Sequence, residues 1–152
     1  PGKGKMNVEQ LRLDLERDEG CIYGIYLDHL GFPTFGIGHL VTSSDPEHGQ
    51  PLGTEVSEDR VKQVFNSDVE CVLDDCDRAF DNFGSLPEGV QLVVANMMFN
   101  LGLPRFNKFK KMIRAVELGD WQSAADEMIS SRWYQQVPKR ARRLESLMRG
   151  VK

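Results

Sequence analysis

Hydrophobic positions recur at helical spacing near the start of the chain. Val8, Leu11 and Leu15 lie three and four residues apart, which predicts one amphipathic helix. Asn7 is a residue type that caps a first helical turn, and Gly20 is a residue type that commonly follows a last one. We therefore expect the helix to begin after Asn7 and to end before Gly20.

From residue 21 to residue 42 the pattern changes to short aromatic and β-branched pieces separated by glycines. Such pieces are typical of a small antiparallel sheet. The stretch that follows, residues 43–55, is rich in serine, proline and glycine and is predicted to be a loop. These segments favour a small lobe of one helix and one sheet over residues 7–56.

The rest of the chain has helical periodicity. Ser57 is expected to open a long helix. Ser85 and Glu88 flank Pro87 at the spacing of a capping box, and the helix that follows is apolar on nearly every side, which indicates the buried centre of a second lobe. Three further amphipathic helices are predicted over Pro104–Leu118, Asp120–Ser131 and Pro138–Arg149.

The predicted fold is α+β but mostly α. It is a single domain over residues 1–152, with the small antiparallel-sheet lobe (7–56), a long connecting helix (57–81) and an all-α C-terminal lobe (82–152). A cleft between two such lobes is the natural place for a site.

Composition narrows the class of protein. The hydrophobic fraction of 40% and the charged fraction of 28% are close to globular averages, which excludes a disordered chain. No apolar run approaches the roughly 20 residues that a membrane helix needs, and we expect no signal peptide because the N-terminus lacks an apolar core. Three cysteines, an odd number, favour reduced thiols in a chain made in a cytoplasm.

Charge is unevenly distributed along the chain. Residues 1–100 hold 7 Lys and Arg against 18 Asp and Glu, a net charge of −11, whereas residues 101–152 hold 12 against 5, a net charge of +7. One end of the molecule should attract anions. This asymmetry alone is compatible with nucleic acid, with an anionic wall polymer or with an acidic part of the same protein.

Two acids stand close to the predicted sheet. Glu19 ends the first helix, where the helix dipole is negative and Asp18 adds a like charge, so a negative charge on Glu19 is disfavoured, as suits a proton donor. Asp28 follows nine positions later in a turn-like setting, and Thr34 six positions further on. Each residue taken alone is compatible with an ordinary structural role, because Asp commonly bonds to nearby backbone in turns. Their combination is what glycosidic cleavage requires.

A different polar residue interrupts the row of apolar positions on one face of the predicted long helix. Asp68 lies four positions from Val64 and from Val72, where a carboxylate is costly unless it is paired. His39 is the available cation, so we expect a structural ion pair between them. We expect no metal site, because no further ligand cluster accompanies this pair. We also expect no cofactor, since Gly36-x-Gly38 lacks the third glycine of a dinucleotide fingerprint.

These residues stand in segments that resemble the lysozymes of T-even bacteriophages. The chain matches that family in order, over most of 7–149, in the segments "RDEG", "IYLDHLGFPTFGIGHL", "FNSDV", "NMMFNLG" and "SRWYQQVPKRARR". The resemblance implies a lysozyme-like fold and cleavage of peptidoglycan at the β-1,4 bond between N-acetylmuramic acid and N-acetylglucosamine, with inversion at the anomeric carbon.

The resemblance also implies a role for each residue. Glu19 is expected to be the general acid, Asp28 to support the attacking water or the transition state, and Thr34 to hold that water. His39 and Asp68 match the family's buried ion pair. The candidate substrate-binding residues are Phe32, Asn100, which stands where the family has a glutamine, and Arg140, which matches an arginine that pairs with the catalytic glutamate.

Other functions remain open at this point. A lytic transglycosylase would need the acid alone, and a catalytically silent peptidoglycan-binding or virion-structural module would need none of the three site residues. A nucleic-acid binder is disfavoured because the basic segment "KRARR" belongs to the family match. We expect a monomer whose partner is bacterial peptidoglycan, present in the host cytoplasm before its release to the cell wall.

Overall fold

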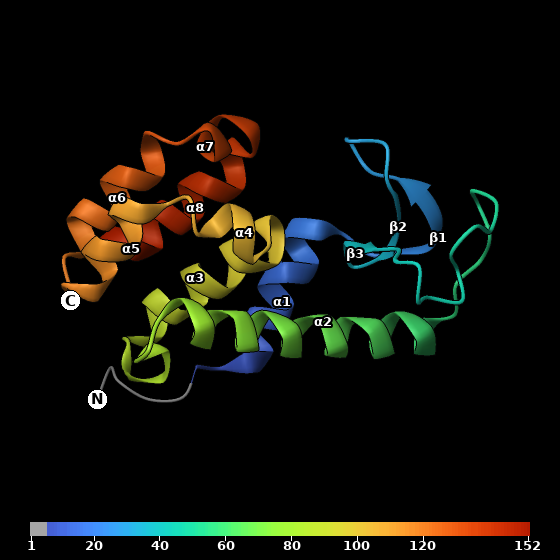
Figure 1. Cartoon of the computed structure of the whole chain (residues 1–152), viewed down its shortest axis with the longest axis horizontal. Helices are drawn as coiled ribbons and strands as arrows, with labels where there is room; N and C mark the ends of the chain where they lie inside the picture. Colours follow the sequence, from blue (N-terminus) through green and yellow to red (C-terminus); the bar gives the residue numbers. More distant parts are fainter. Residues whose placement is uncertain (1–5) are drawn as a thin grey trace. The chain divides into compact units, whose positions relative to one another are not determined.

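The computed structural model describes residues 6–152, and the chain divides into two compact units (Figure 1). The first, here called the sheet unit, is Arg12–Cys71. The second, the helical unit, contains the residues up to Leu11 and Val72–Lys152. The structure is mostly helical with one three-stranded antiparallel sheet, so the predicted fold class is confirmed.

The first helix, α1 (Val8–Glu19), begins and ends as its sequence predicts. The side-chain oxygen Oδ1 of Asn7 accepts a hydrogen bond from the backbone N–H of Gln10 at 3.1 Å, which satisfies one donor of the first turn. At the other end Gly20 has φ +76°, and its N–H donates to the carbonyl of Glu16 at 2.8 Å. A left-handed glycine ends the helix directly after Glu19.

The sheet has the strand order β1 (Ile22–Leu27), β2 (Pro33–Gly36) and β3 (His39–Leu40). Tyr26 pairs with Thr34, and Thr34 pairs with Leu40, so these three side chains share one face of the sheet. Phe35 lies on the opposite face and is fully buried. The second helix, α2 (Glu58–Ala79), begins at the predicted place, with the Ser57 hydroxyl accepting from Arg60 N–H at 3.1 Å.

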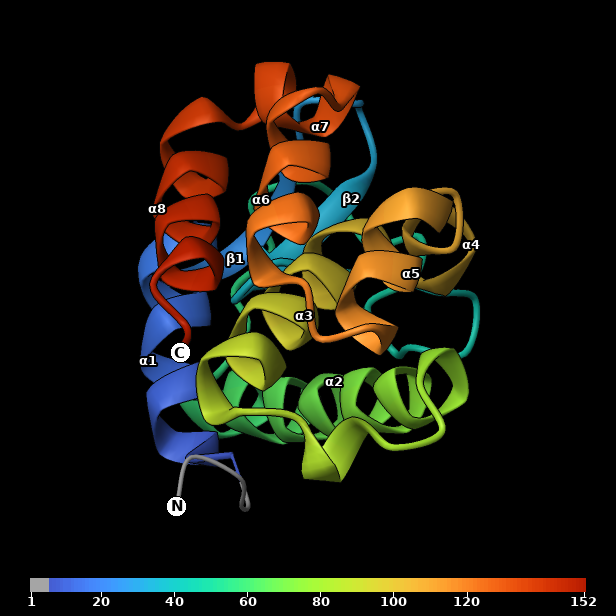
Figure 2. The same ribbon diagram turned by 90° about the vertical axis from the view of Figure 1, so that its left-hand side faces the viewer.

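The helical unit is built around α3 (Glu88–Leu101), which is buried on nearly every side, as predicted. Around it lie α5 (Lys110–Glu117), α6 (Trp121–Ile129) and α8 (Pro138–Arg149), and Figure 2 shows α6 and α8 side by side. Within the described residues no helix is both long enough and apolar enough to cross a membrane.

One helix prediction is wrong in detail, and one short helix was not predicted. The helix expected over Pro104–Leu118 is divided into α4 (Leu103–Phe106) and α5, because a turn at residues 107–109 stacks the ring of Phe109 on that of Phe106 at a centroid distance of 6.3 Å. A short helix, α7 (Arg132–Gln136), also follows α6, and its first turn is capped by a hydroxyl that accepts from Tyr134 N–H.

The capping box expected before α3 does not form. The N-cap of α3 is Pro87, which makes no side-chain cap, and the carboxylate of Glu88 accepts instead from the backbone N–H of Asn7 at 3.0 Å. A contact between residues 81 positions apart has thus replaced the local one.

Candidate active site

Glu19 lies at the end of α1 with its carboxylate against the turn between β2 and β3. A Cβ atom placed on Gly38 would lie 2.6 Å from Oε1 of Glu19 and 2.9 Å from its Cδ. Gly38 has φ +63°, a left-handed conformation that glycine adopts without strain. Only a residue without a side chain therefore allows the backbone to approach the Glu19 carboxylate this closely.

Asp28 is held by its own loop. Its Oδ1 accepts hydrogen bonds from the N–H groups of Leu30 at 2.9 Å and Phe32 at 2.8 Å, and its backbone N–H donates to the Phe32 carbonyl at 2.9 Å. These are the local bonds that Asp makes in turns. In the part of the chain that the structure describes, Oδ2 accepts none. One oxygen thus orients the carboxylate while the other remains available to a ligand or water.

Thr34 is tied to the same residue as Asp28. Its hydroxyl donates to the carbonyl of Phe32 at 2.9 Å, and the residue is only 4% exposed. The backbone of Phe32 therefore fixes both Asp28 and Thr34, while Phe32 as a residue is 51% exposed. Since the hydroxyl proton is used, the oxygen of Thr34 can still accept a hydrogen bond from water.

The pKa of Tyr26 shows that negative charge lies near this face of the sheet. Its pKa is raised above 10.0, first by burial and then by the negative charges of Glu19 and of Asp28. Both carboxylates thus act on one half-buried phenol. Tyr26 also pairs with Thr34 in the sheet, so it is linked to Thr34 by strand pairing and to the two acids through their charges.

His39 lies between two carboxylates, not one. Its Nδ1 is 2.7 Å from Oδ2 of Asp68, and its Nε2 is 2.8 Å from Oδ2 of Asp45. Asp45 in turn contacts Arg60, with 3.2 Å between its Oδ1 and a guanidinium nitrogen, and Arg60 makes two bonds of 2.9 Å to Glu47. This network joins the end of the sheet, the 42–57 loop and α2.

The network shifts the ionisation of its members. Burial lowers the pKa of His39, but the hydrogen bonds and charges of Asp68 and Asp45 outweigh it, so the pKa of His39 lies above 6.5. Burial raises the pKa of Asp45, but hydrogen bonds from Thr42 N–H and His39 outweigh it, so the pKa of Asp45 lies below 3.8. Both shifts favour a charged pair.

The remaining candidates belong to the helical unit. Arg140 is 8% exposed, and its Nε donates to Oδ1 of Asn96 at 2.8 Å. The side-chain oxygen of Asn100 accepts from Nε1 of Trp133 at 2.7 Å, so its NH₂ group is the part left for a substrate. The predicted pairing of Arg140 with Glu19 and the predicted substrate contacts stay predictions.

Several structural partners were not identified from the sequence. No sequence spacing relates His39 to its partners in the network, which are Asp45, Arg60 and Glu47. Only the folded structure shows that these side chains lie together. Gly38 had a visible signal, because a glycine beside a strand end often marks a close backbone approach. Among the described residues, no group of three His, Cys, Asp or Glu side chains could hold a metal ion.

Two carboxylates and a hydroxyl next to one small sheet are the groups that a glycoside hydrolase uses. Comparison with known proteins agrees. The phage lysozyme family model matches residues 16–149, and this chain belongs to that family.

Individual relatives differ in length. The chain is 28% identical to "Probable T4-type lysozyme 2" of Dictyostelium discoideum, over 92% of this chain and 94% of that protein. It is 26% identical to "Pre-baseplate central spike protein Gp5" of Enterobacteria phage T4, over 88% of this chain and 26% of that protein. It is 28% identical to "Peptidoglycan hydrolase gp36" of Pseudomonas phage phiKMV, over 92% and 15%. The chain thus spans nearly all of the first relative and a minor part of the two phage proteins.

Proposed function

We propose that this protein is a peptidoglycan hydrolase of the N-acetylmuramidase type. It cleaves the β-1,4 bond between N-acetylmuramic acid and N-acetylglucosamine, with inversion, and so lyses bacterial cell wall. The observation that carries the proposal is that, within the sheet unit, Glu19 lies against the β2–β3 turn while the Phe32 backbone holds both Asp28 and Thr34. Membership of the phage lysozyme family supports the same reaction class.

Glu19 serves as the general acid in this proposal. It gives a proton to the glycosidic oxygen as the bond to the anomeric carbon breaks, because the leaving sugar is expelled far more readily as an alcohol than as an alkoxide. The close approach of Gly38 supports this role, since it limits the positions that the carboxyl group can take.

Asp28 and Thr34 act on the attacking water. Oδ1 of Asp28 is occupied by two backbone donors, which leaves Oδ2 to accept a proton from water as that water attacks the anomeric carbon. The oxygen of Thr34 accepts the second hydrogen bond of the water and sets its direction. Attack by water on the face opposite the leaving group inverts the configuration.

Three other residues contact the glycan in this proposal. The exposed ring of Phe32 offers an apolar face to a sugar ring, directly beside Asp28. Asn100 presents its NH₂ group, because Trp133 already engages its oxygen. Arg140 is oriented by Asn96 and supplies positive charge.

The decisive experiment compares wild type, Glu19→Gln and the control Glu16→Gln on purified peptidoglycan. Glu16 is exposed on the same helix one turn earlier, so its substitution makes the same chemical change at a residue that is not a candidate for catalysis. We expect the wild type and Glu16→Gln to release reducing muramic ends and Glu19→Gln to lose cleavage. Equal activity of all three variants would overturn the assignment.

The chemistry of the products distinguishes the proposed hydrolase from the two alternative functions. A lytic transglycosylase would leave 1,6-anhydro muramic ends, detectable by mass spectrometry, and a silent binding module would release no fragments at all. Inversion is tested by following the anomer first formed with proton NMR. For Asp28→Asn, which keeps the oxygen that accepts the two backbone bonds, we expect roughly a 10²- to 10⁴-fold loss of kcat if Asp28 is the base.

We also propose a monomer that is present in the host cytoplasm before it reaches the wall. The three cysteines are unpaired, and free thiols fit a reducing compartment. Sedimentation of the purified protein tests the first statement, and fractionation of infected or expressing cells tests the second. A stable dimer or a protein found outside the cytoplasm before lysis would contradict them.

A further inference from the structure

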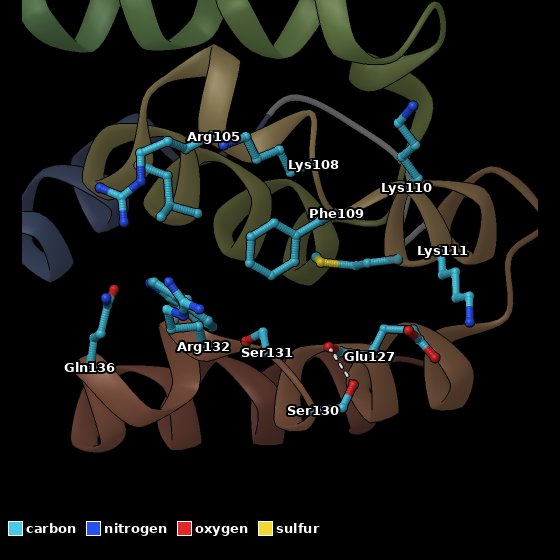
Figure 3. Close-up of a pocket in the computed structure, with 13 residues that line it drawn as sticks. Arg105, Lys108, Phe109, Lys110, Lys111, Glu127, Ser130, Ser131, Arg132 and Gln136 are labelled. Atoms are coloured by element: carbon cyan, nitrogen blue, oxygen red, sulfur yellow. Dashed lines mark hydrogen bonds between the residues drawn. The ribbon is translucent and has the colours of Figure 1, made fainter.

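A pocket of the helical unit contains none of the three predicted catalytic residues. It has a volume of about 620 Å³ and lies where α4, α5, α6 and α7 meet (Figure 3). All of its lining residues belong to the helical unit. The predicted acid, Glu19, instead contacts the turn between β2 and β3, and this contact lies within the sheet unit. Residues that hold this turn can therefore act on the acid.

The sheet alone holds the turn between β2 and β3 only weakly. β3 is two residues long and pairs with β2 at two positions. At the start of the turn Gly36 is fixed by packing, because a Cβ placed on it would lie 3.0 Å from a methyl carbon of Val61 in α2. At the end of the turn Gly38 is followed directly by His39. The position of the Gly38 backbone therefore depends on what holds the His39 side chain.

Both ring nitrogens of His39 are bonded to carboxylates. Nδ1 lies 2.7 Å from Oδ2 of Asp68, and Nε2 lies 2.8 Å from Oδ2 of Asp45. A neutral imidazole has one N–H group, so only the protonated ring can donate to both partners. Burial disfavours this charged ring, but the two carboxylates outweigh burial and raise the pKa of His39. A ring that is bonded on both sides cannot rotate without the loss of a hydrogen bond.

Asp45 is itself fixed in place by its own loop. Oδ2 of Asp45 also accepts from the backbone N–H of Thr42 at 2.8 Å, and its Oδ1 lies 3.2 Å from a guanidinium nitrogen of Arg60. The side chains of His39 and Asp45 are 11% and 14% exposed, whereas that of Asp68 is 28% exposed. The bond between His39 and Asp45 is thus the better shielded of the two, and shielding from water strengthens a charged hydrogen bond.

We propose that Asp45 is a positioning residue for the predicted acid, Glu19. Its bond to Nε2 of His39 fixes the end of the turn at Gly38, and the turn limits the positions of the Glu19 carboxyl group. The last step follows from close contact, because a Cβ placed on Gly38 would lie 2.6 Å from Oε1 of Glu19. A turn that shifts or loosens therefore moves or frees the carboxyl group. Asp45 contacts no reacting atom, and its role rests on the proposed function.

The test compares Asp45→Ala with the matched control Glu47→Ala. Glu47 lies in the same loop, its side chain is 11% exposed, and it makes two bonds of 2.9 Å to Arg60. Both substitutions remove a shielded carboxylate that binds Arg60, but of the two only Asp45 bonds to His39. A third variant, Asp45→Asn, keeps an oxygen that can accept from Nε2 of His39 and from Thr42 N–H.

Initial rates are measured over a range of peptidoglycan concentrations, at a temperature at which circular dichroism shows every variant to be folded. If Asp45→Ala does not fold, Asp45→Ser replaces it, because a serine hydroxyl can still accept from Thr42 N–H but is too short to reach His39. We expect kcat to fall roughly tenfold in Asp45→Ala, less than about twofold in Glu47→Ala and less than about threefold in Asp45→Asn, with KM nearly unchanged throughout.

Three results would overturn the positioning role. The first is a wild-type kcat in Asp45→Ala, and the second is an equal loss of kcat in Glu47→Ala, which would point to stability alone. The third is an Asp45→Asn variant as slow as Asp45→Ala, since a retained hydrogen bond would then have no effect. A change confined to KM counts with the first result, because it leaves kcat at the wild-type value.

A second measurement needs no substrate and separates this inference from the proposed function. The ¹³C resonance of the Glu19 carboxyl carbon should shift or broaden in Asp45→Ala and stay unchanged in Glu47→Ala. If the wild type does not cleave peptidoglycan but this difference is observed, the hydrolase assignment fails alone. If the wild type cleaves and the Glu19 resonance is the same in both variants, the positioning role of Asp45 fails alone.

Discussion

Substitution of Gly38 by alanine tests how closely the backbone controls the Glu19 carboxylate. The new Cβ would lie 2.6 Å from Oε1 of Glu19 and 3.1 Å from its Cγ. Non-bonded heavy atoms settle about 3.5 Å apart, so the carboxylate or the turn must move by roughly 0.9 Å. A displacement of about 1 Å in a catalytic group costs on the order of 10²-fold in rate. We therefore expect kcat/KM on peptidoglycan to fall about 100-fold.

The control is Gly53→Ala. Gly53 has φ +86°, so alanine there carries a similar conformational cost, but its Cβ would meet nothing within 4 Å. Both variants should lose about 1–2 kcal/mol in the free energy of unfolding, because alanine is disfavoured in the left-handed region. Urea unfolding measures this loss, and turbidity of a peptidoglycan suspension measures activity. The reasoning is refuted if Gly38→Ala and Gly53→Ala retain equal activity.

The other predictions concern stability. Asp45→Asn should lower the free energy of unfolding by about 1–3 kcal/mol, since it removes a charged partner of His39. Chemical denaturation measures this change, and an unchanged denaturation midpoint would contradict the expectation. Because the pKa of His39 is raised, its contribution to stability should be complete below pH 6.5 and be lost as pH rises through its native pKa. The melting temperatures of wild type and Asp68→Asn, measured across pH 5–10, test this expectation. A difference between the two that does not change with pH would contradict it. Because the pKa of Asp45 is lowered, the corresponding acid loss should occur as pH falls below 3.8. Trp133→Phe keeps an aromatic ring but removes the hydrogen-bond donor to Asn100, so the free energy of unfolding should fall by about 1 kcal/mol. Thermal unfolding measures this change, and an unchanged stability would mean that the bond is not stabilising.

Local chemistry explains the predictions that the structure confirms. The first helix lies between Asn7 and Gly20, because the cap and the left-handed stop act over only a few residues. The same holds for the Ser57 cap of α2 and for the period change that predicts the sheet. Short-range hydrogen bonds and side-chain periodicity depend only on residues that are close in the sequence, so they can be predicted from the sequence.

Long-range packing explains the predictions that were wrong or missing. Where a predicted helix is divided, Phe106 packs against Phe80 and Phe109 against Trp133, and the bond from Asn7 N–H to Glu88 replaces a predicted capping box. In each case a contact that the local sequence does not contain has a lower free energy than the local alternative. Intrinsic propensity is a weak prior against such contacts.

The sequence by itself determined the fold class, the family and the chemical identity of the three candidate catalytic residues. Only the tertiary structure decided how they are held: Glu19 against Gly38, and Asp28 and Thr34 through the backbone of Phe32. It also decided that His39 has Asp45 as a second partner. The physical reason is that composition and periodicity are properties of neighbouring residues, whereas close approach and ion pairing depend on distances that exist only once the chain has folded.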